Sequence, residues 1–74
     1  MNFYDVVYKL AGDKQLSIEN LSLSLGKTSR YIGGAKSRGS LPKVDNAAMI
    51  LDALDYTLCA IPKDKVPKDA IIID

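Results

Sequence analysis

The chain has 74 residues, of which 47% are hydrophobic and 26% charged, and its formal net charge is +1. This length predicts a single domain that buries about 60% of the surface that its unfolded chain exposes. Because the sequence has no histidine and only one cysteine, it excludes an internal disulfide, a structural zinc site and most histidine-dependent catalysis, and we expect no enzyme activity, no metal and no cofactor.

The first predicted element is an amphipathic helix from Asn2 to Ala11. Asn2 is a cap-type residue at its start, and Gly12 is a stop signal after it. Its apolar residues recur at the i, i+3, i+4, i+7 spacing that places side chains on one helix face: Phe3, Val6, Val7 and Leu10. One face of this helix is therefore expected to lie against the core.

A second, short helix is predicted to follow Ser17. Ser17 is an N-cap residue, and Leu16 before it is placed to pack on Leu21, four positions into the helix, as a hydrophobic staple. Gly26 is the predicted end of this helix, because glycine readily takes the left-handed conformation of a helix C-terminus.

A third helix is predicted over residues 28–37. Thr28 is a cap-type residue only two positions after Gly26, so this helix must turn sharply relative to the second. The residues expected to face the core are Tyr31, Ile32 and Ala35. Those expected on or near the outer side are Ser29, Arg30, Gly33, Lys36 and Ser37.

A fourth helix is predicted beyond a loop that runs from Ser37 to Pro42. Its apolar residues are Val44, Ala47, Ala48, Leu51 and Leu54. The pattern then changes to strand-forming residues from Tyr56 to Ile61, and a second β-branched run extends from Ala70 to Ile73. These two runs are predicted to form either a hairpin or strands that pair across a dimer.

Positive charge is concentrated in residues 27–43, which contain no acidic residue. The five basic residues are Lys27, Arg30, Lys36, Arg38 and Lys43. Such a block is what a surface for a polyanion needs, although basic residues that cluster in sequence also occur on an ordinary solvated surface.

The tripeptide Gly26-Lys27-Thr28 has the composition of the end of a nucleotide-binding phosphate loop. Such a loop also needs a glycine five positions before Gly26, and it connects a buried strand to a helix. That position is Leu21, within a helical pattern, and no doubly wound sheet fits in 74 residues. The sequence therefore argues against a nucleotide-binding loop.

The order of a helix, a turn at Gly26 and a second helix resembles the helix-turn-helix of the phage lambda repressor and Cro-type family, often called XRE-like regulators, from Leu16 to Asp55. The matching positions are Leu16 and Ser17 at the motif's start, Leu21 as its buried leucine, Gly26 as its turn glycine, Thr28 as the cap of the recognition helix and Ile32 as the core anchor. The chain departs from the family pattern at Ile18, Ser22, Lys27 and Lys36.

The resemblance implies a mainly α, lambda-repressor-like bundle of four or five helices with a short C-terminal β-hairpin or dimer-forming strands. Residues 1–55 are then the DNA-binding domain, with the motif at about 17–36. Residues 56–74 are a C-terminal dimerisation extension. No apolar run is long enough to span a membrane and the N-terminus lacks the basic-then-apolar layout of a signal peptide, so we expect a cytoplasmic protein.

The function that the resemblance implies is sequence-specific binding of double-stranded DNA by a homodimeric transcriptional repressor of phage or mobile-element type. Its recognition helix, residues 28–37, would lie in the major groove. Predicted base readout falls on Ser29, Arg30, Gly33 and Gly34. Predicted phosphate contacts fall on Ser17, Lys27, Thr28, Lys36, Arg38 and Lys43. An antitoxin-like or anti-repressor protein that also binds a protein partner is the alternative.

Two adjacent glycines in a recognition helix need an explanation, because each costs roughly 0.5–1 kcal/mol relative to alanine. Gly33 and Gly34 are expected either to let the helix sit close to DNA or to let another helix pack closely against it.

Overall fold

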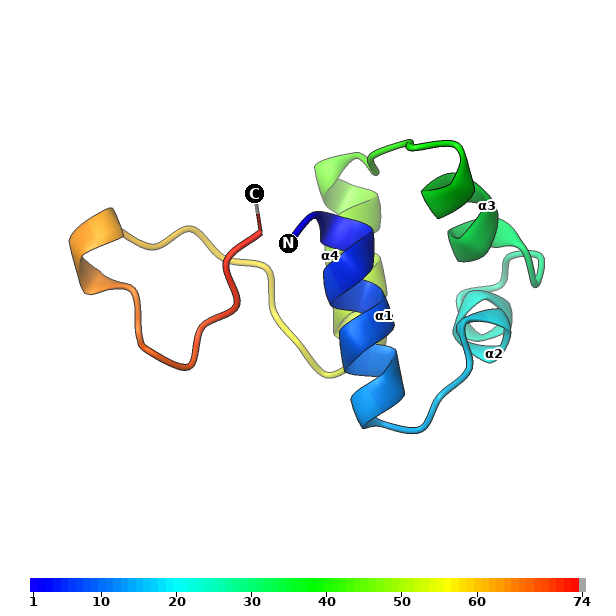
Figure 1. Ribbon diagram of the computed structural model, residues 1–74, viewed down its shortest axis with the longest axis horizontal. Helices are drawn as coiled ribbons and strands as arrows, with labels where there is room; N and C mark the ends of the chain where they lie inside the picture. The colour runs from blue at the N-terminus through cyan, green and yellow to red at the C-terminus, as the bar shows by residue number, and fades with distance from the viewer. Residues whose placement is uncertain (74) are drawn as a thin grey trace.

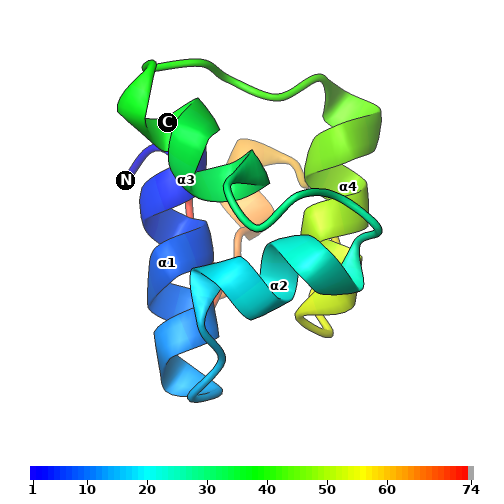
Figure 2. The ribbon, with the colours of Figure 1, turned by 90° about the vertical axis from the view of Figure 1, so that its right-hand side faces the viewer.

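The computed structural model describes residues 1–73, and in this range it is built of four α-helices and one 3-10 turn (Figure 1). The elements are α1 (Phe3–Asp13), α2 (Ile18–Ser24), α3 (Tyr31–Ser37), α4 (Val44–Ala53) and the 3-10 turn Lys63–Lys65. Helices α1 and α4 run side by side, and α2 and α3 cover one side of this pair (Figure 2). The chain after α4 lies on the opposite side.

The core lies between the four helices. Its fully buried side chains are Val6, Val7, Leu10, Leu21, Ile32, Ile50 and Leu54, and Phe3, Ala35, Ala47 and Leu51 are also buried. Burying one such Leu, Ile or Val side chain contributes about 1.5–3 kcal/mol. The apolar faces predicted for the first three helices are confirmed, apart from Tyr31, which is only partly buried.

The inward face of α4 differs from the prediction at Val44, at Ala48, which is only partly buried, and at Ile50. Val44 is 75% exposed, so its predicted place in the core is wrong, whereas Ile50 is fully buried. The set Ala47, Ile50, Leu51 and Leu54 fits the i, i+3, i+4, i+7 spacing completely, and Val44 merely opens the helix. Val44 lies in the first turn of α4, and its side chain is exposed there.

The first two helices begin as the sequence predicts. The Asn2 side chain accepts a hydrogen bond from the Asp5 backbone N–H (2.9 Å), and Ser17 Oγ accepts one from the Asn20 N–H (3.0 Å). Each bond satisfies a first-turn donor that has no partner inside its helix. Leu16 packs against the core, as a staple residue should.

Thr28 does not cap α3, and that prediction is wrong. The Thr28 carbonyl instead accepts a hydrogen bond from the Tyr31 N–H (3.1 Å), which closes a separate turn before the helix. Helix α3 therefore begins at Tyr31, and Arg30 occupies its N-cap position without a side-chain cap.

All four helices end in the same arrangement, in which one residue with positive φ reverses the chain. After α2, the Lys27 N–H donates to the Ser22 carbonyl (3.2 Å) and the Gly26 N–H to the Leu23 carbonyl (2.9 Å), which is a Schellman motif. The reversing residues are Gln15, Gly26, Gly39 and Asp55, with φ of 56°, 76°, 69° and 63°. The turn role of Gly26 is confirmed. The predicted stop at Gly12 is wrong, because Gly12 lies inside α1.

The predicted C-terminal hairpin does not form in residues 1–73, which contain no β-strand. The segment between the two predicted strands contains Pro62 and Pro67, whose carbonyls accept turn hydrogen bonds from the Lys65 and Ala70 N–H groups (2.9 and 3.2 Å). This connection is longer than the two to five residues typical of a hairpin loop, and its prolines fix local turns. The two apolar runs instead border a hollow of about 400 Å³ that Leu10 also lines.

Candidate nucleic-acid interface

Helices α2 and α3 are joined by a buried hydrogen-bonded serine. The Ser22 hydroxyl donates to the Ile18 carbonyl (2.9 Å) and accepts from the Ile32 N–H (3.3 Å), and Ser22 is fully buried. The Ile32 N–H belongs to the first turn of α3, which has no intrahelical acceptor for it. Ser22 thus supplies, from the neighbouring helix, a partner of the kind that a capping side chain would otherwise provide.

This role of Ser22 was not predicted from the sequence, where Ser22 was only a departure from the family pattern. The signal was a polar residue next to Leu21 on an otherwise apolar helix face. Its two hydrogen bonds fix how α3 leaves the turn at Gly26. They therefore fix which face of α3 points away from the core.

The two residues at the centre of the outer face of α3 are glycines, which carry no side chain. Ile32 and Ala35 face the core. At 100° per residue, the opposite face carries Arg30, Gly33, Gly34 and Ser37. Arg30 and Ser37 are exposed and lie at the two ends of this face, while both glycines are partly exposed between them.

The surroundings of the two glycines show what they make room for. A Cβ atom on Gly33 would lie 3.5 Å from the Tyr8 hydroxyl of α1, which is ordinary contact. A Cβ atom on Gly34 would lie 3.1 Å from Arg38 Nη1, the end of a flexible side chain. Neither glycine has the positive φ of Gly26, so the backbone does not require glycine at either position. Close approach of backbone from another helix is likewise absent around them within residues 1–73.

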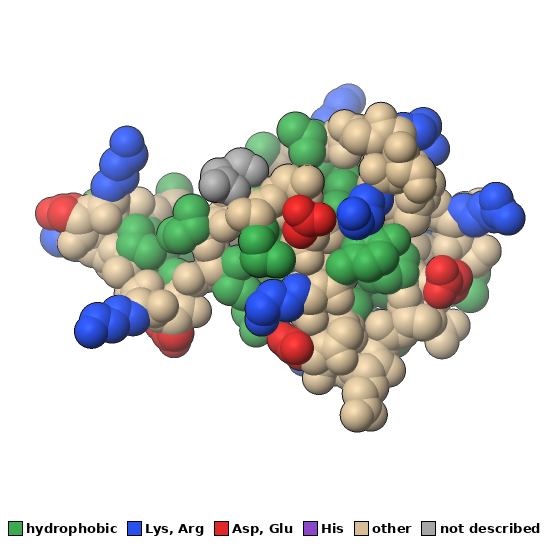
Figure 3. Space-filling model, viewed as in Figure 1, with side chains coloured by type: hydrophobic (Ala, Val, Ile, Leu, Met, Phe, Trp, Pro, Cys, Tyr) green, Lys and Arg blue, Asp and Glu red, His purple; other side chains and the backbone are tan. Residues whose placement is uncertain are grey.

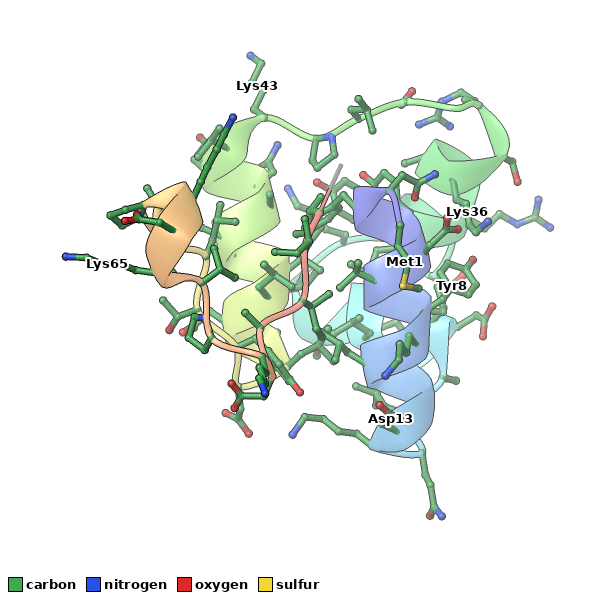
Figure 4. The ribbon with its side chains drawn as sticks, turned by 60° about the vertical axis from the view of Figure 1, so that its left-hand side comes forward. Met1, Tyr8, Asp13, Lys36, Lys43 and Lys65 are labelled. Carbon is green, nitrogen blue, oxygen red and sulfur yellow. The ribbon has the colours of Figure 1, made fainter. Side chains whose placement is uncertain are left out.

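Lys36 lies against α1 rather than beside the other basic residues of its helix. Its Nζ is 3.5 Å from Asp5 Oδ1 and 5.4 Å from the centre of the Tyr8 ring (Figure 4). Both partners of the ion pair are half-exposed, and such pairs contribute about 0–1 kcal/mol. A phosphate would therefore compete with Asp5 for this ammonium at small cost.

The other predicted contact residues lie at the starts of α2 and α4 and in the turns before and after α3. Lys27 Nζ is 5.3 Å from the centre of the Tyr31 ring, directly after the Gly26 turn. Lys43 extends from the start of α4, away from the helices (Figure 4). The remaining predicted contacts, Ser17, Thr28, Ser29 and Arg38, are exposed. Figure 3 shows basic side chains around the α3 end of the molecule, and a second group on the C-terminal segment.

Tyr4 connects α1 electrostatically to both ends of α3. Burial raises the pKa of its phenol above the ordinary value of 10.0, the neighbouring Tyr31 raises it further, and the positive charge of Arg38 lowers it. Arg38 therefore lies within electrostatic reach of a buried residue of α1, although its own side chain is exposed.

Within residues 1–73 no helix has the length and apolar character needed to cross a bilayer. Comparisons with protein families, with curated proteins and with solved structures give no match for this chain.

Proposed function

We propose that the protein is a sequence-specific DNA-binding transcriptional regulator of the lambda repressor and Cro type, acting as a repressor. The observation that carries this proposal is the outer face of α3, which begins with an exposed Arg30 and has two residues without side chains, Gly33 and Gly34, at its centre. This face belongs to a segment, residues 27–43, that has five basic side chains and no acidic one.

In this proposal, α3 enters the major groove with its outer face toward the bases. Arg30 donates two hydrogen bonds to O6 and N7 of a guanine, the commonest specific contact in protein–DNA complexes. Ser29 lies beside it and reaches a neighbouring base edge. Gly33 and Gly34 add no side chain of their own between the helix and the base pairs.

Phosphate contacts supply most of the affinity. Lys27 and Lys43 lie before and after α3, and exposed hydroxyls at Ser17 and Thr28 add neutral donors. Lys36 also contacts a phosphate, once its ion pair with Asp5 is broken. Each phosphate that a cation neutralises makes the logarithm of the affinity fall by about 0.9 for each tenfold rise in salt.

A homodimer completes the proposal, because one short recognition helix reads few base pairs. Two copies would read half-sites about 34–36 Å apart, one helical turn of DNA. The C-terminal segment, residues 56–74, would supply the dimer contact. The runs Tyr56–Ile61 and Ala70–Ile73 keep strand-forming composition and half-exposed apolar side chains, which suit pairing with a second chain.

The same segment supports the alternative, an antitoxin-like or anti-repressor protein that binds a protein partner as well as DNA. Ile72 is 59% exposed and Tyr56 is 44% exposed, and both border the apolar hollow beside α1 and α4. Exposed apolar residues gathered in this way are typical of a protein contact surface.

The experiment is selection of binding sites from a random duplex library, followed by affinity measurements at several salt concentrations. We expect an enriched palindromic site, and for Arg30→Ala a loss of about tenfold or more on that site with relaxed preference at one base pair. Lys9→Ala, on α1 and outside both α3 and the C-terminal segment, is the matched control and should leave site preference unchanged. Failure to enrich any site, with stoichiometric capture of a protein partner instead, would contradict the proposal.

A further inference from the structure

Arg38 lies back along α3 instead of extending beyond its end. It is the C-cap residue of the helix and stands four positions after Gly34, on the same side. A Cβ atom built on Gly34 would lie only 3.1 Å from Arg38 Nη1, so the guanidinium occupies the place that a side chain at position 34 would take.

This geometry forms a row of positions along the exposed side of α3. Arg30, Gly34 and Arg38 are spaced i, i+4, i+8, and residues at this spacing lie one above the other on a helix. By folding toward Gly34, the guanidinium of Arg38 comes to within about one helical turn, roughly 5.4 Å along the axis, of the level of Arg30.

We propose that Arg38 is a second specificity-determining residue, which Gly34 positions by leaving room for its guanidinium on the DNA-facing side of α3. The ligand is a guanine edge in the major groove next to the base pair that Arg30 reads, because a guanidinium matches the O6 and N7 acceptors of guanine. This inference rests on the proposed function. In this inference, the missing side chain at Gly34 leaves space for the Arg38 guanidinium, which contacts the base.

The competing explanation is that Gly34 acts directly, by letting DNA approach the helix backbone. The two explanations differ in how Gly34 and Arg38 depend on each other. If the glycine acts through Arg38, a methyl group at position 34 has no further effect once the guanidinium is absent. If the glycine acts directly on DNA, its effect is independent of residue 38.

A double-mutant cycle on the selected duplex separates these cases. We expect Gly34→Ala and Arg38→Ala each to weaken specific binding by about tenfold or more and to relax preference at the same base pair. The double variant should bind no more weakly than Arg38→Ala alone. Lys43→Ala is the matched control, and it should weaken binding to all duplexes uniformly while lowering the salt slope by about one.

Nuclear Overhauser effects between the Arg38 side chain and the Gly34 α-protons supply a readout that needs no DNA. They should be present in the wild-type protein and reduced in Gly34→Ala. Site-preferring binding with additive losses, or a loss in Arg38→Ala that is equal on all duplexes, would overturn the role of Arg38 and leave the proposed function intact. A wild-type protein without any site preference would overturn both.

Discussion

Replacing Ser22 with alanine removes the only side-chain oxygen within hydrogen-bonding distance of the Ile32 N–H in the described residues. The change leaves that buried N–H without a partner, and an unsatisfied buried donor costs about 1–3 kcal/mol. Loss of the bond to the Ile18 carbonyl costs less, because that carbonyl remains within the hydrogen-bonded helix. We therefore expect Ser22→Ala to lower the free energy of unfolding by about 1–3 kcal/mol.

For a domain of this size, each kcal/mol shifts the midpoint of thermal unfolding by about 4–8 °C. Thermal and urea unfolding followed by circular dichroism measure the change. The matched control is Ser24→Ala, since Ser24 Oγ also donates to a helix carbonyl, that of Leu21 (2.7 Å), but Ser24 is exposed and serves no N–H of α3. Its effect should stay within about 0.5 kcal/mol. Equal losses in the two variants would refute the role given to Ser22.

Three further predictions concern the fold. Gly26→Ala should lower the free energy of unfolding by about 1–2 kcal/mol, because alanine is strained at a φ of 76°. Gly12→Ala, in the last turn of α1, should raise it by about 0.5–1 kcal/mol. Urea unfolding measures both changes, and two changes in the same direction would contradict these helix ends. In the same assay, Ile50→Ala should lower the free energy of unfolding by about 2–5 kcal/mol, and Val44→Ala should lower it by less than about 0.5 kcal/mol. Similar losses in the two variants would mean that a different face of α4 packs against the core. The pKa of the Tyr4 phenol is raised above 10.0, so its contribution to stability is complete below pH 10 and is lost as the pH rises above 10. The free energy of unfolding should therefore decline less at alkaline pH in Tyr4→Phe than in the wild-type protein. An equal decline in both would argue against a buried phenol.

The parts of the fold that the sequence predicts are those encoded by neighbouring residues. The caps Asn2 and Ser17 act three residues along the chain, and the turn at Gly26 needs only a backbone conformation that glycine takes easily. The start of α3 could not be predicted in the same way. Its first-turn N–H is satisfied by Ser22, ten residues earlier and on another helix, so the local capping signal at Thr28 was misleading.

The C-terminal segment shows a second limit of local patterns. Residues Tyr56–Ile61 have strand-forming composition, but a strand also needs a partner at the right register, and the turns at Pro62 and Pro67 do not bring Ala70–Ile73 into that position. Propensity alone therefore predicted strands that a single chain does not pair.

The residue types of the candidate site could be predicted from the sequence, but the directions in which their side chains point could not. The basic block and the outer glycines can be found in the sequence, because helical periodicity places Arg30, Gly33 and Gly34 opposite Ile32. The orientation of the long side chains cannot be found in the sequence. Lys36 turns toward Asp5 of α1 and Arg38 folds back over Gly34, and both depend on groups that only the folded chain brings close.

An amide chemical-shift titration of isotopically labelled protein with the selected duplex tests directly whether α3 reads DNA. We expect the largest changes at Arg30, Gly33 and Gly34, whose backbone lies on the outer face of α3, with smaller changes at Lys27 and Lys43. Residues 56–73 should change little in a protein that is already dimeric. Changes confined to that C-terminal segment, or no change at α3 at saturating duplex, would contradict the claim that α3 reads DNA.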